Sequence, residues 1–177
     1  MVIGDIMLDQ TIWTEVNRIS PEAPVPVCKV TKTTYAMGGA GNVITNLQSL
    51  GARISIAAII GTDQTGKQIK KELIQRQIDI SLLLEKQEFP SILKSRVIAK
   101  NQQLCRIDYE DISQDLTQQQ SIMEQAIKDS IDSYDALIIS DYGKGLISAP
   151  FSTKIIDLAN QHNVPIIIDP KGKDASK

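Results

Sequence analysis

The sequence predicts an α/β fold in which helices cover both faces of a parallel β-sheet. Three observations lead to this prediction. Short apolar segments rich in β-branched residues alternate along the chain with segments whose apolar residues recur at helical spacing. Polar residues follow several of the apolar segments, where loops are expected. The chain's 177 residues also suffice for one domain with a substantial core.

The apolar segments are predicted to be buried strands. They lie at residues 1–3, 53–60, 136–140 and 164–168, with a further short apolar run at 82–84. The segment at 53–60 is almost continuously apolar, as strands covered on both faces are. Residues 1–3 lead directly into Gly4 and Asp5, which is typical of the last part of such a strand.

Helices are expected between these strands. They are predicted at residues 43–51, 65–77, from 117 onward and at 148–161. Thr117 and Gln120 have the spacing of a capping box, in which two side chains satisfy the free backbone groups of a helix start. In the last helix, Phe151, Ile155 and Leu158 share one face, which we expect to point inward.

Two segments interrupt the alternation. Residues 12–30 contain three prolines and are too proline-rich for a helix interior or a central strand. Residues 92–108 read as a hairpin with a polar turn at 100–103. Together they could form a small extra sheet that covers a site or contacts a second subunit.

Composition excludes several classes of protein. The net charge of −2 gives no attraction to nucleic acid or to a membrane surface, and neither a membrane span nor a signal peptide is present in this sequence. Cys28 and Cys105 are far apart and are predicted to be unlinked thiols of a cytoplasmic protein. His162 is the only histidine, which excludes a histidine-rich metal site, and it is expected at a helix end.

A glycine-rich segment at residues 38–42 precedes the first predicted helix. Glycines let a backbone approach a ligand closely, and a helix start offers free N–H groups. Asn42 adds a donor and an acceptor that suit a polyhydroxylated ligand. The segment lacks the G-x-G-x-x-G spacing and does not directly follow the first strand, so a dinucleotide site is disfavoured; no phosphate-binding P-loop motif is present either.

Acidic residues lie at the predicted carboxyl ends of strands, where α/β proteins bind ligands. Asp5 and Asp9 follow the first strand, Asp141 follows residues 136–140, and Asp169 with Lys171 follows the last strand. Such carboxylates can accept hydrogen bonds from sugar hydroxyls or hold a hydrated Mg²⁺. The alternative is that each one caps a helix or begins a turn.

Basic residues provide candidate contacts to an anion. Lys144 lies in a glycine-flanked turn and could neutralise a phosphate, although a solvated loop lysine is the alternative. Lys94 and Arg96 share one face of the predicted hairpin, as do Arg106 and Asp108 on its second strand. If the strands pair, they form a cationic face suited to an anionic ligand; the alternative is a solvated outer face.

The sequence resembles the ribokinase-like (PfkB) family of sugar kinases and, within it, the heptose 7-phosphate kinases. The resemblance rests on segments that run in order along the whole chain: residues 2–9, 18–27, 38–43, 101–104, 140–145 and 169–172. The glycine box is general to the family, whereas Arg-Ile-Ser-Pro-Glu-Ala-Pro-Val-Pro and Asn-Gln-Gln are specific to the heptose kinases.

The resemblance implies a ribokinase-like, Rossmann-type core with a small β-lid formed near residues 10–37 and 90–110, and residues 1–177 as the N-terminal part of one kinase domain. The implied reaction transfers the γ-phosphate of ATP, with Mg²⁺, to O1 of D-glycero-D-manno-heptose 7-phosphate on the route to ADP-heptose for lipopolysaccharide. A homodimer through the lid is also implied.

The resemblance also implies roles for particular residues, and it leaves the metal ligands unassigned. The implied contacts to the sugar phosphate are Asp9, Gly38, Gly39, Asn42, Lys94, Arg96, Gln103, Arg106 and Asp141. On the nucleotide side they are Lys144, Asp169 and Lys171.

One departure from the family pattern matters for function. The Gly-Ala-Gly-Asp segment, which supplies the anion hole and the catalytic base, does not occur, so the base is expected beyond Lys177. We therefore expect a C-terminally truncated kinase domain that is nearly inactive alone and that has an exposed edge strand because its sheet stops after Asp169. A complementing C-terminal half is the alternative to the homodimer as a partner. The alternatives are a non-catalytic sugar-phosphate-binding or dimerisation module, another PfkB-type sugar kinase and, more distantly, a nicotinamide-binding domain.

Overall fold

The body of the protein is a parallel sheet between two pairs of helices. The computed structural model describes residues 1–171. Within them, five parallel strands lie in the order β5-β4-β1-β8-β9. The strands are β1 (Val2–Gly4), β4 (Ser55–Gly61), β5 (Asp79–Lys86), β8 (Leu137–Ser140) and β9 (Ile166–Asp169). The helical elements are α1 (Ala40–Ser49), α2 (Gln64–Gln75), α3 (Thr117–Ser130), the short 3₁₀ helix Ile131–Ser133 and α4 (Ala149–Gln161).

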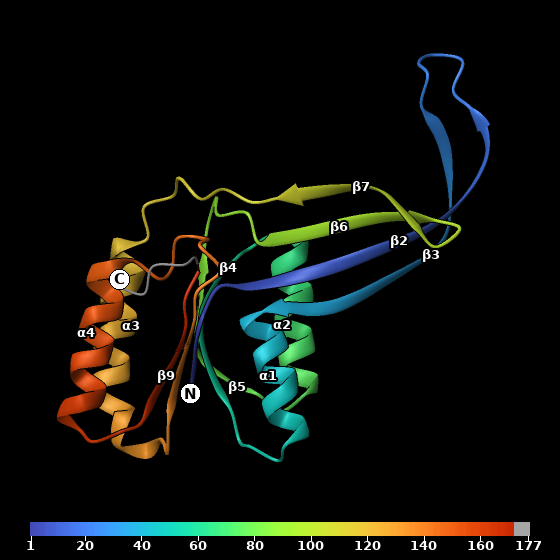
Figure 1. Ribbon diagram of the computed structural model, residues 1–177. Coiled ribbons are helices and arrows are strands. Elements are labelled where there is room, and N and C mark those ends of the chain that lie inside the picture. The colour runs from blue at the N-terminus through green and yellow to red at the C-terminus, as the bar shows by residue number, and fades with distance from the viewer. Residues whose placement is uncertain (172–177) are drawn as a thin grey trace.

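The helices cover both faces of this sheet, as predicted. Figure 1 shows α1 and α2 on one face and α3 and α4 on the other. Strand β4 contributes to both cores, because Ile59 packs in the cluster with α3 and α4 while Ile56 and Ile60 pack in the cluster with α1 and α2. Burial on both faces explains why this strand is almost entirely apolar. The core strands and helices were therefore predictable from their apolar pattern.

Side chains cap the starts of α2 and α4 but not those of α1 and α3. Asp63 accepts a hydrogen bond from the Gly66 amide at the start of α2, and Ser148 accepts one from the Phe151 amide at the start of α4. The capping box expected at the start of α3 is wrong. Leu116 occupies the N-cap position without a side-chain cap, and the Gln120 side chain donates instead to the Leu146 carbonyl. A tertiary contact replaces the local one.

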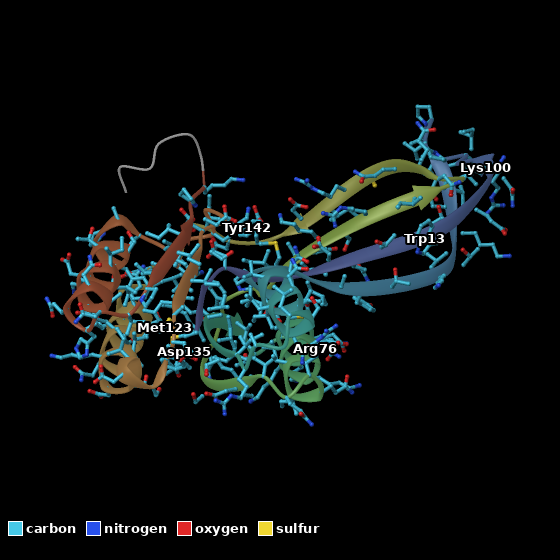
Figure 2. The ribbon with its side chains drawn as sticks, turned by 60° about the horizontal axis from the view of Figure 1, so that its bottom comes forward. Trp13, Arg76, Lys100, Met123, Asp135 and Tyr142 are labelled. Carbon is cyan, nitrogen blue, oxygen red and sulfur yellow. The ribbon has the colours of Figure 1, made fainter. Side chains whose placement is uncertain are left out.

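A second sheet projects from the body. Its strands, in the order β3-β2-β6-β7, are β2 (Ile6–Ile19), β3 (Pro26–Gly39), β6 (Ile92–Ala99) and β7 (Gln102–Tyr109). Two antiparallel hairpins, β2/β3 and β6/β7, are joined by parallel pairing between β2 and β6. Figure 1 shows this sheet passing over the ends of α1 and α2 and projecting beyond them, and Figure 2 shows Trp13 and Lys100 on it, far from Met123 and Asp135. We call it the β-extension.

The proline-rich segment belongs to the small extra sheet that its sequence allowed. Strand β2 continues to Ile19, and only residues 20–25 form the turn. Pro26 is the first residue of β3, an edge strand whose proline needs no donor toward a neighbour on its outer side. The prolines therefore delimit the hairpin rather than break it. The hairpin at β6/β7 was predicted correctly, with its turn at Lys100 and Asn101.

The strand register sorts the side chains of the β-extension onto two faces. The charged face carries Asp9, Thr11, Lys94, Arg96, Arg106 and Asp108, which occupy paired positions on three strands. On the opposite, apolar face, Tyr35, Gln10, Ser95 and Ile107 form one row across all four strands. Hydrogen bonds from Gln10 to Tyr35 and from Ser95 to Gln10 link that row.

Three smaller expectations also bear on the fold. In the described part of the chain, no helix is long and apolar enough to cross a membrane. Cys28 and Cys105 form no disulfide, as predicted. His162 lies at the C-terminal end of α4, also as predicted, and its Nδ1 is 2.7 Å from Oδ1 of Asp132.

Strand β9 is an edge of the main sheet within the described residues. It pairs with β8 on one side only. Its side chains Ile167 and Ile168 are 60% and 41% exposed. Apolar side chains on an open strand edge favour association with another strand or another chain.

Candidate functional site

The carboxyl ends of β1, β8 and β9 form the edge at which the candidate site lies. Gly4, Ser140 and Asp169 are paired in register, so the residues that follow them emerge side by side. Gly4 has no room for a β-carbon, which would overlap the Ser140 carbonyl oxygen. The strands therefore approach closely at the point where an α/β sheet presents its ligand crevice.

Asp5 organises the loop after β8. Its carboxylate accepts hydrogen bonds from the backbone amides of Tyr142 and Lys144, each at 3.0 Å, and of Leu146 at 3.4 Å. The residue is only 4% exposed, and this burial raises the pKa of Asp5 even though the three amides work in the opposite direction. Asp5 therefore has a structural role in a turn, which was the alternative to ligand binding that its sequence position allowed.

The glycine box joins this strand end to a helix. Gly39 has a φ of 57° and a ψ of −132°, and a β-carbon there would overlap the Asp5 carbonyl oxygen. That oxygen accepts a hydrogen bond of 2.9 Å from the Ala40 amide, the first of α1. Only glycine satisfies both requirements. The start of α1 is thereby held beside β1, with Asn42 exposed on its first turn.

Asp9, Gly38 and Arg96 form a compact polar group at the root of the β-extension. Arg96 donates to Oδ1 of Asp9 at 2.5 Å. A β-carbon on Gly38 would overlap Oδ2 of Asp9, so the missing side chain makes room for this carboxylate. The group joins three of the sequence-predicted site residues. Asp9 was expected to follow the end of a strand, but it lies within β2.

The cationic face expected on the hairpin is a mixed-charge network. Lys144 is 2.7 Å from Glu110, and Glu110 is 3.2 Å from Lys94. Lys94 is in turn 3.0 Å from Asp108, which is 2.9 Å from Arg106. Three cations thus meet two carboxylates, because strand pairing places Asp108 directly opposite Lys94. The strands pair as the expected cationic face requires, and the carboxylates of Asp108 and Glu110 offset part of its charge.

The remaining nucleotide-side candidates lie along the same sheet edge. Asp141 is buried, and its carboxylate accepts hydrogen bonds from the Gly143 and Lys171 amides. Asp169 and Lys171 are exposed, and the Asp169 carbonyl accepts the Asp141 amide at 3.0 Å. Gly172, the last residue of the motif that begins at Asp169, lies outside the described residues.

Gln103 stands apart from the other candidates. Gln103, on β7, pairs with Ile98 of β6. Ile98 lies four residues farther along β6 than Lys94, which pairs with Asp9. At about 3.3 Å per residue this is about 13 Å from the Asp9 row. Gln103 is also exposed near the outer turn. Its nearest candidates are Arg96 and Arg106, which pair two residues from Ile98 along β6, about 7 Å away, and no hydrogen bond or ion pair in the described part of the chain joins Gln103 to them.

The described residues do not form a site built for a metal ion. In residues 1–171, no group of three or more His, Cys, Asp or Glu side chains is placed to hold one. The carboxylates of Asp5 and Asp141 at the strand ends already accept backbone amides. Mg²⁺ prefers free carboxylate oxygens together with water and phosphate oxygens. The residues present therefore do not fit a protein-built Mg²⁺ site.

Sequence reasoning missed two residues of this region. Glu110 links Lys94 to Lys144, and it continues the alternation of Arg106 and Asp108, a period-two signal that could have identified it. Ser91 anchors the root of β6: its hydroxyl accepts the Gly61 amide at 2.8 Å, and its own amide donates to Asp63. No local pattern distinguishes Ser91.

A separate cleft of about 850 Å³ lies at the opposite edge of the main sheet. Its lining includes Ser55 and Asp79, the first residues of β4 and β5, together with Arg76 and Asp135. Figure 2 shows Arg76 and Asp135 on the side of the body away from Tyr142. The cleft is therefore distinct from the carboxyl-end site.

Comparison with known proteins identifies the family. The model of the pfkB family of carbohydrate kinases matches residues 1–177, and the chain belongs to this family. It is 41% identical to the bifunctional protein HldE of Campylobacter curvus over 177 residues, 100% of this chain and 37% of that protein. It is also 41% identical to HldE of Helicobacter pylori over 180 residues, 100% of this chain and 38% of that protein. The chain thus spans less than two fifths of these relatives.

Solved structures show the ribokinase-like fold. A carbohydrate kinase from Agrobacterium tumefaciens matches with a TM-score of 0.68 and 17% identity, over 94% of this chain and 52% of that one. Phosphofructokinase-2 from Escherichia coli in complex with fructose-6-phosphate matches with a TM-score of 0.65 and 17% identity, over 98% of this chain and 55% of that one. A ribokinase from Cryptococcus neoformans in complex with ADP matches with a TM-score of 0.61 and 13% identity, over 96% of this chain and 49% of that one. At these identities the likeness concerns the fold alone.

Proposed function

We propose that this chain provides the sugar-binding part of a kinase that transfers the γ-phosphate of ATP to O1 of D-glycero-D-manno-heptose 7-phosphate. The observation that carries the proposal is the Asp9–Arg96 pair packed over Gly38 at the root of the β-extension. Similarity to HldE proteins along the whole chain supports it. The heptose substrate is favoured by segments 18–27 and 101–104, which resemble those of heptose kinases.

In this proposal, Asp9 and its neighbours recognise sugar hydroxyls. Arg96 engages one carboxylate oxygen of Asp9, and among the described residues the other oxygen, Oδ2, has no hydrogen-bond partner. A carboxylate that is fixed on one side and free on the other can accept a hydrogen bond from a hydroxyl in a defined direction. The bare backbone at Gly39 and the exposed Asn42 amide, on the first turn of α1, complete the hydroxyl-binding set.

The phosphate of the sugar is assigned to the charged face. Arg106 is 52% exposed, and within residues 1–171 only its Nε is engaged, by Asp108. Its terminal nitrogens can therefore form a bidentate contact with a phosphate. The network around it retains one positive charge, since Lys94, Lys144 and Arg106 face Asp108 and Glu110. Gln103 is assigned a contact with the same ligand only if the β-extension folds over it.

The nucleotide is assigned to the carboxyl ends of β8 and β9. Lys144 and Lys171 supply positive charge there, beside Asp141 and Asp169. Phosphoryl transfer depends on positioning and on charge stabilisation, both of which such residues can provide. We propose that ATP reaches this edge with Mg²⁺ already bound to its phosphates.

Titration calorimetry with D-glycero-D-manno-heptose 7-phosphate tests the proposal. We expect binding by the chain, weaker binding of fructose 6-phosphate and none of NAD. Asp9→Asn should weaken binding by about ten- to a hundredfold, because an amide cannot replace both the ion pair and the acceptor. Asp129→Asn, on the exposed surface of α3, is the matched control and should leave the affinity unchanged. Absence of heptose phosphate binding would contradict the proposal.

A phosphorylation assay with Mg-ATP then separates a kinase from a non-catalytic binding module. Product formation, by the chain alone or after addition of a C-terminal half, supports the kinase. Binding without phosphorylation under both conditions favours the sugar-phosphate-binding module.

We also propose that a second copy of the chain covers the apolar face of the β-extension. Tyr35 and Tyr109 are 50% and 55% exposed, and Ile107 is 43% exposed, on a sheet face of which α1 and α2 cover only the root. Contiguous exposed apolar surface of this kind is typical of protein interfaces. Ile107→Glu should convert a dimer to a monomer in size-exclusion chromatography with light scattering, whereas Leu50→Glu, at the end of α1, should not.

A further inference from the structure

We propose that Glu110 is a positioning residue that fixes the β-extension and the loop after β8 relative to each other, so that Lys94 faces the sugar phosphate and Lys144 faces the nucleotide side in a set geometry. The substrate part of this inference rests on the proposed function. Glu110 directly follows β7 and therefore lies where the β-extension joins the body.

The contacts of Glu110 connect two separate parts of the fold. One carboxylate oxygen is 2.7 Å from Lys144 in the strand-end loop, and the other is 3.2 Å from Lys94 on β6. The side chains of Lys144, Lys94 and Glu110 are only 17%, 13% and 24% exposed, so water screens these pairs less than it screens ordinary surface pairs. The carboxylate thus bridges the two lysines.

The loop on the far side of the bridge is itself rigidly held. Asp5 accepts the backbone amides of Tyr142, Lys144 and Leu146, which leaves this loop little freedom relative to β1. A continuous path of hydrogen bonds and ion pairs therefore runs from the end of β1 through Lys144 and Glu110 to β6. Lys94 also contacts Asp108, whereas Lys144 has Glu110 as its single side-chain partner in the described residues. Lys144 is consequently the lysine that depends most on Glu110.

Partial burial tends to raise the pKa of Glu110, but hydrogen bonds from Lys144 and Lys94 outweigh this effect and hold the pKa below its ordinary value. The carboxylate is therefore charged at neutral pH, as a bridge between two ammonium groups requires.

Glu110→Gln in the full chain tests the inference with two measurements. The amide keeps the size of the side chain but loses its charge and one acceptor. We expect the affinity for heptose 7-phosphate to fall about tenfold, since misplaced contact groups lose binding energy. We also expect faster decay of the fluorescence anisotropy of Trp13, the single tryptophan, because the β-extension that carries it becomes more mobile. Glu85→Gln, which breaks the exposed pair with Lys70, is the control and should change neither quantity.

Each outcome has a defined meaning. If the wild-type chain binds the sugar phosphate, the inference requires both changes in Glu110→Gln, and either change without the other overturns it. If the wild-type chain binds no sugar phosphate, the proposed function fails. The anisotropy of Trp13 then decides alone whether Glu110 fixes the β-extension, and an unchanged decay overturns the inference.

Discussion

The carboxylate of Asp9 lies against the backbone of Gly38, in the space that a side chain would otherwise fill. The two residues are on adjacent antiparallel strands, where Met7 pairs with Gly38 and Asp9 with Ala36. A glycine is needed here because it leaves space for a side chain on the neighbouring strand, and not because of its own backbone conformation. This relationship gives Gly38 a different physical role from Gly39, whose backbone conformation itself requires glycine.

The first prediction concerns Gly38→Ala. The new methyl group would overlap Oδ2 of Asp9 and come within 2.8 Å of Cγ of Met7. We expect a loss of about 1–3 kcal/mol of unfolding free energy, as for other overpacked sites. Heptose phosphate affinity should fall with it, because Asp9 is displaced from Arg96. Urea unfolding and calorimetry measure the two effects.

A double variant separates the overlap from other effects of the alanine. In Gly38→Ala combined with Asp9→Ala, the carboxylate is no longer present, so part of the stability lost in the single variant should return. Strictly additive losses would show that the overlap with Asp9 is not the cause.

The second prediction concerns the root of β6. Ser91→Ala leaves the buried amide of Gly61 without its acceptor, which costs about 1–3 kcal/mol of unfolding free energy. Ser121→Ala, on the exposed side of α3, is the control and should change stability by no more than about 0.5 kcal/mol. Urea unfolding monitored by circular dichroism provides both values, and equal effects of the two substitutions would contradict the prediction.

The third prediction is a pH dependence set by Asp5. Because burial raises the pKa of Asp5 in the folded chain, the folded state binds more protons than the unfolded state between the unfolded and folded pKa values. The contribution of Asp5 to stability is therefore full below the unfolded pKa, decreases as the pH rises through the folded pKa, and is constant above it.

Asp5→Asn removes this dependence and also leaves one backbone amide poorly satisfied. The variant should be less stable than the wild type, and the difference in unfolding free energy should be larger near about pH 4 than near about pH 7. Urea titrations at the two pH values measure it. A difference that grows with pH would indicate that the folded state favours ionised Asp5.

The fourth prediction concerns the open edge at β9. The exposed Ile167 should promote self-association at micromolar concentration, and Ile167→Lys should reduce it, since an edge lysine opposes strand addition. Leu50→Lys provides the control, because Leu50 is 82% exposed but lies at the end of α1. Dynamic light scattering over a concentration series distinguishes the two variants. Equal effects would assign association to general surface hydrophobicity.

The core of the fold could be predicted because its signals are local. The apolar run at β4 and the one-sided pattern of Phe151, Ile155 and Leu158 in α4 fix the element type and the buried face together. Asp9 and Gly38 were also selected as site candidates from sequence. Their contact was not foreseen, since it depends on the register between β2 and β3.

The wrong predictions about individual side chains share one cause, which is a contact with a residue distant in the sequence. Gln120 has the correct spacing for a capping box, in which its Oε1 would accept a backbone amide, but in the folded chain its Nε2 donates to the Leu146 carbonyl and its Oε1 accepts the Ser148 hydroxyl. Lys94 and Arg96 appear as a cationic pair along the strand, yet across the strands they meet Asp108 and Asp9. In both cases, partners distant in the sequence determine what a side chain does.

The parallel pairings have a consequence for how the chain folds during synthesis. The central strand β1 needs β8, with Val2 beside Ile138, and β2 needs β6, with Met7 beside Ile92. Strands β1 and β2 therefore wait for partner strands that are synthesised later, although the β2/β3 hairpin can pair at once and β1 can pair with β4 before β8 is made. Domains with such non-local contacts fold slowly and expose strand edges meanwhile. We expect the early chain to depend on chaperones more than an all-helical protein of equal length.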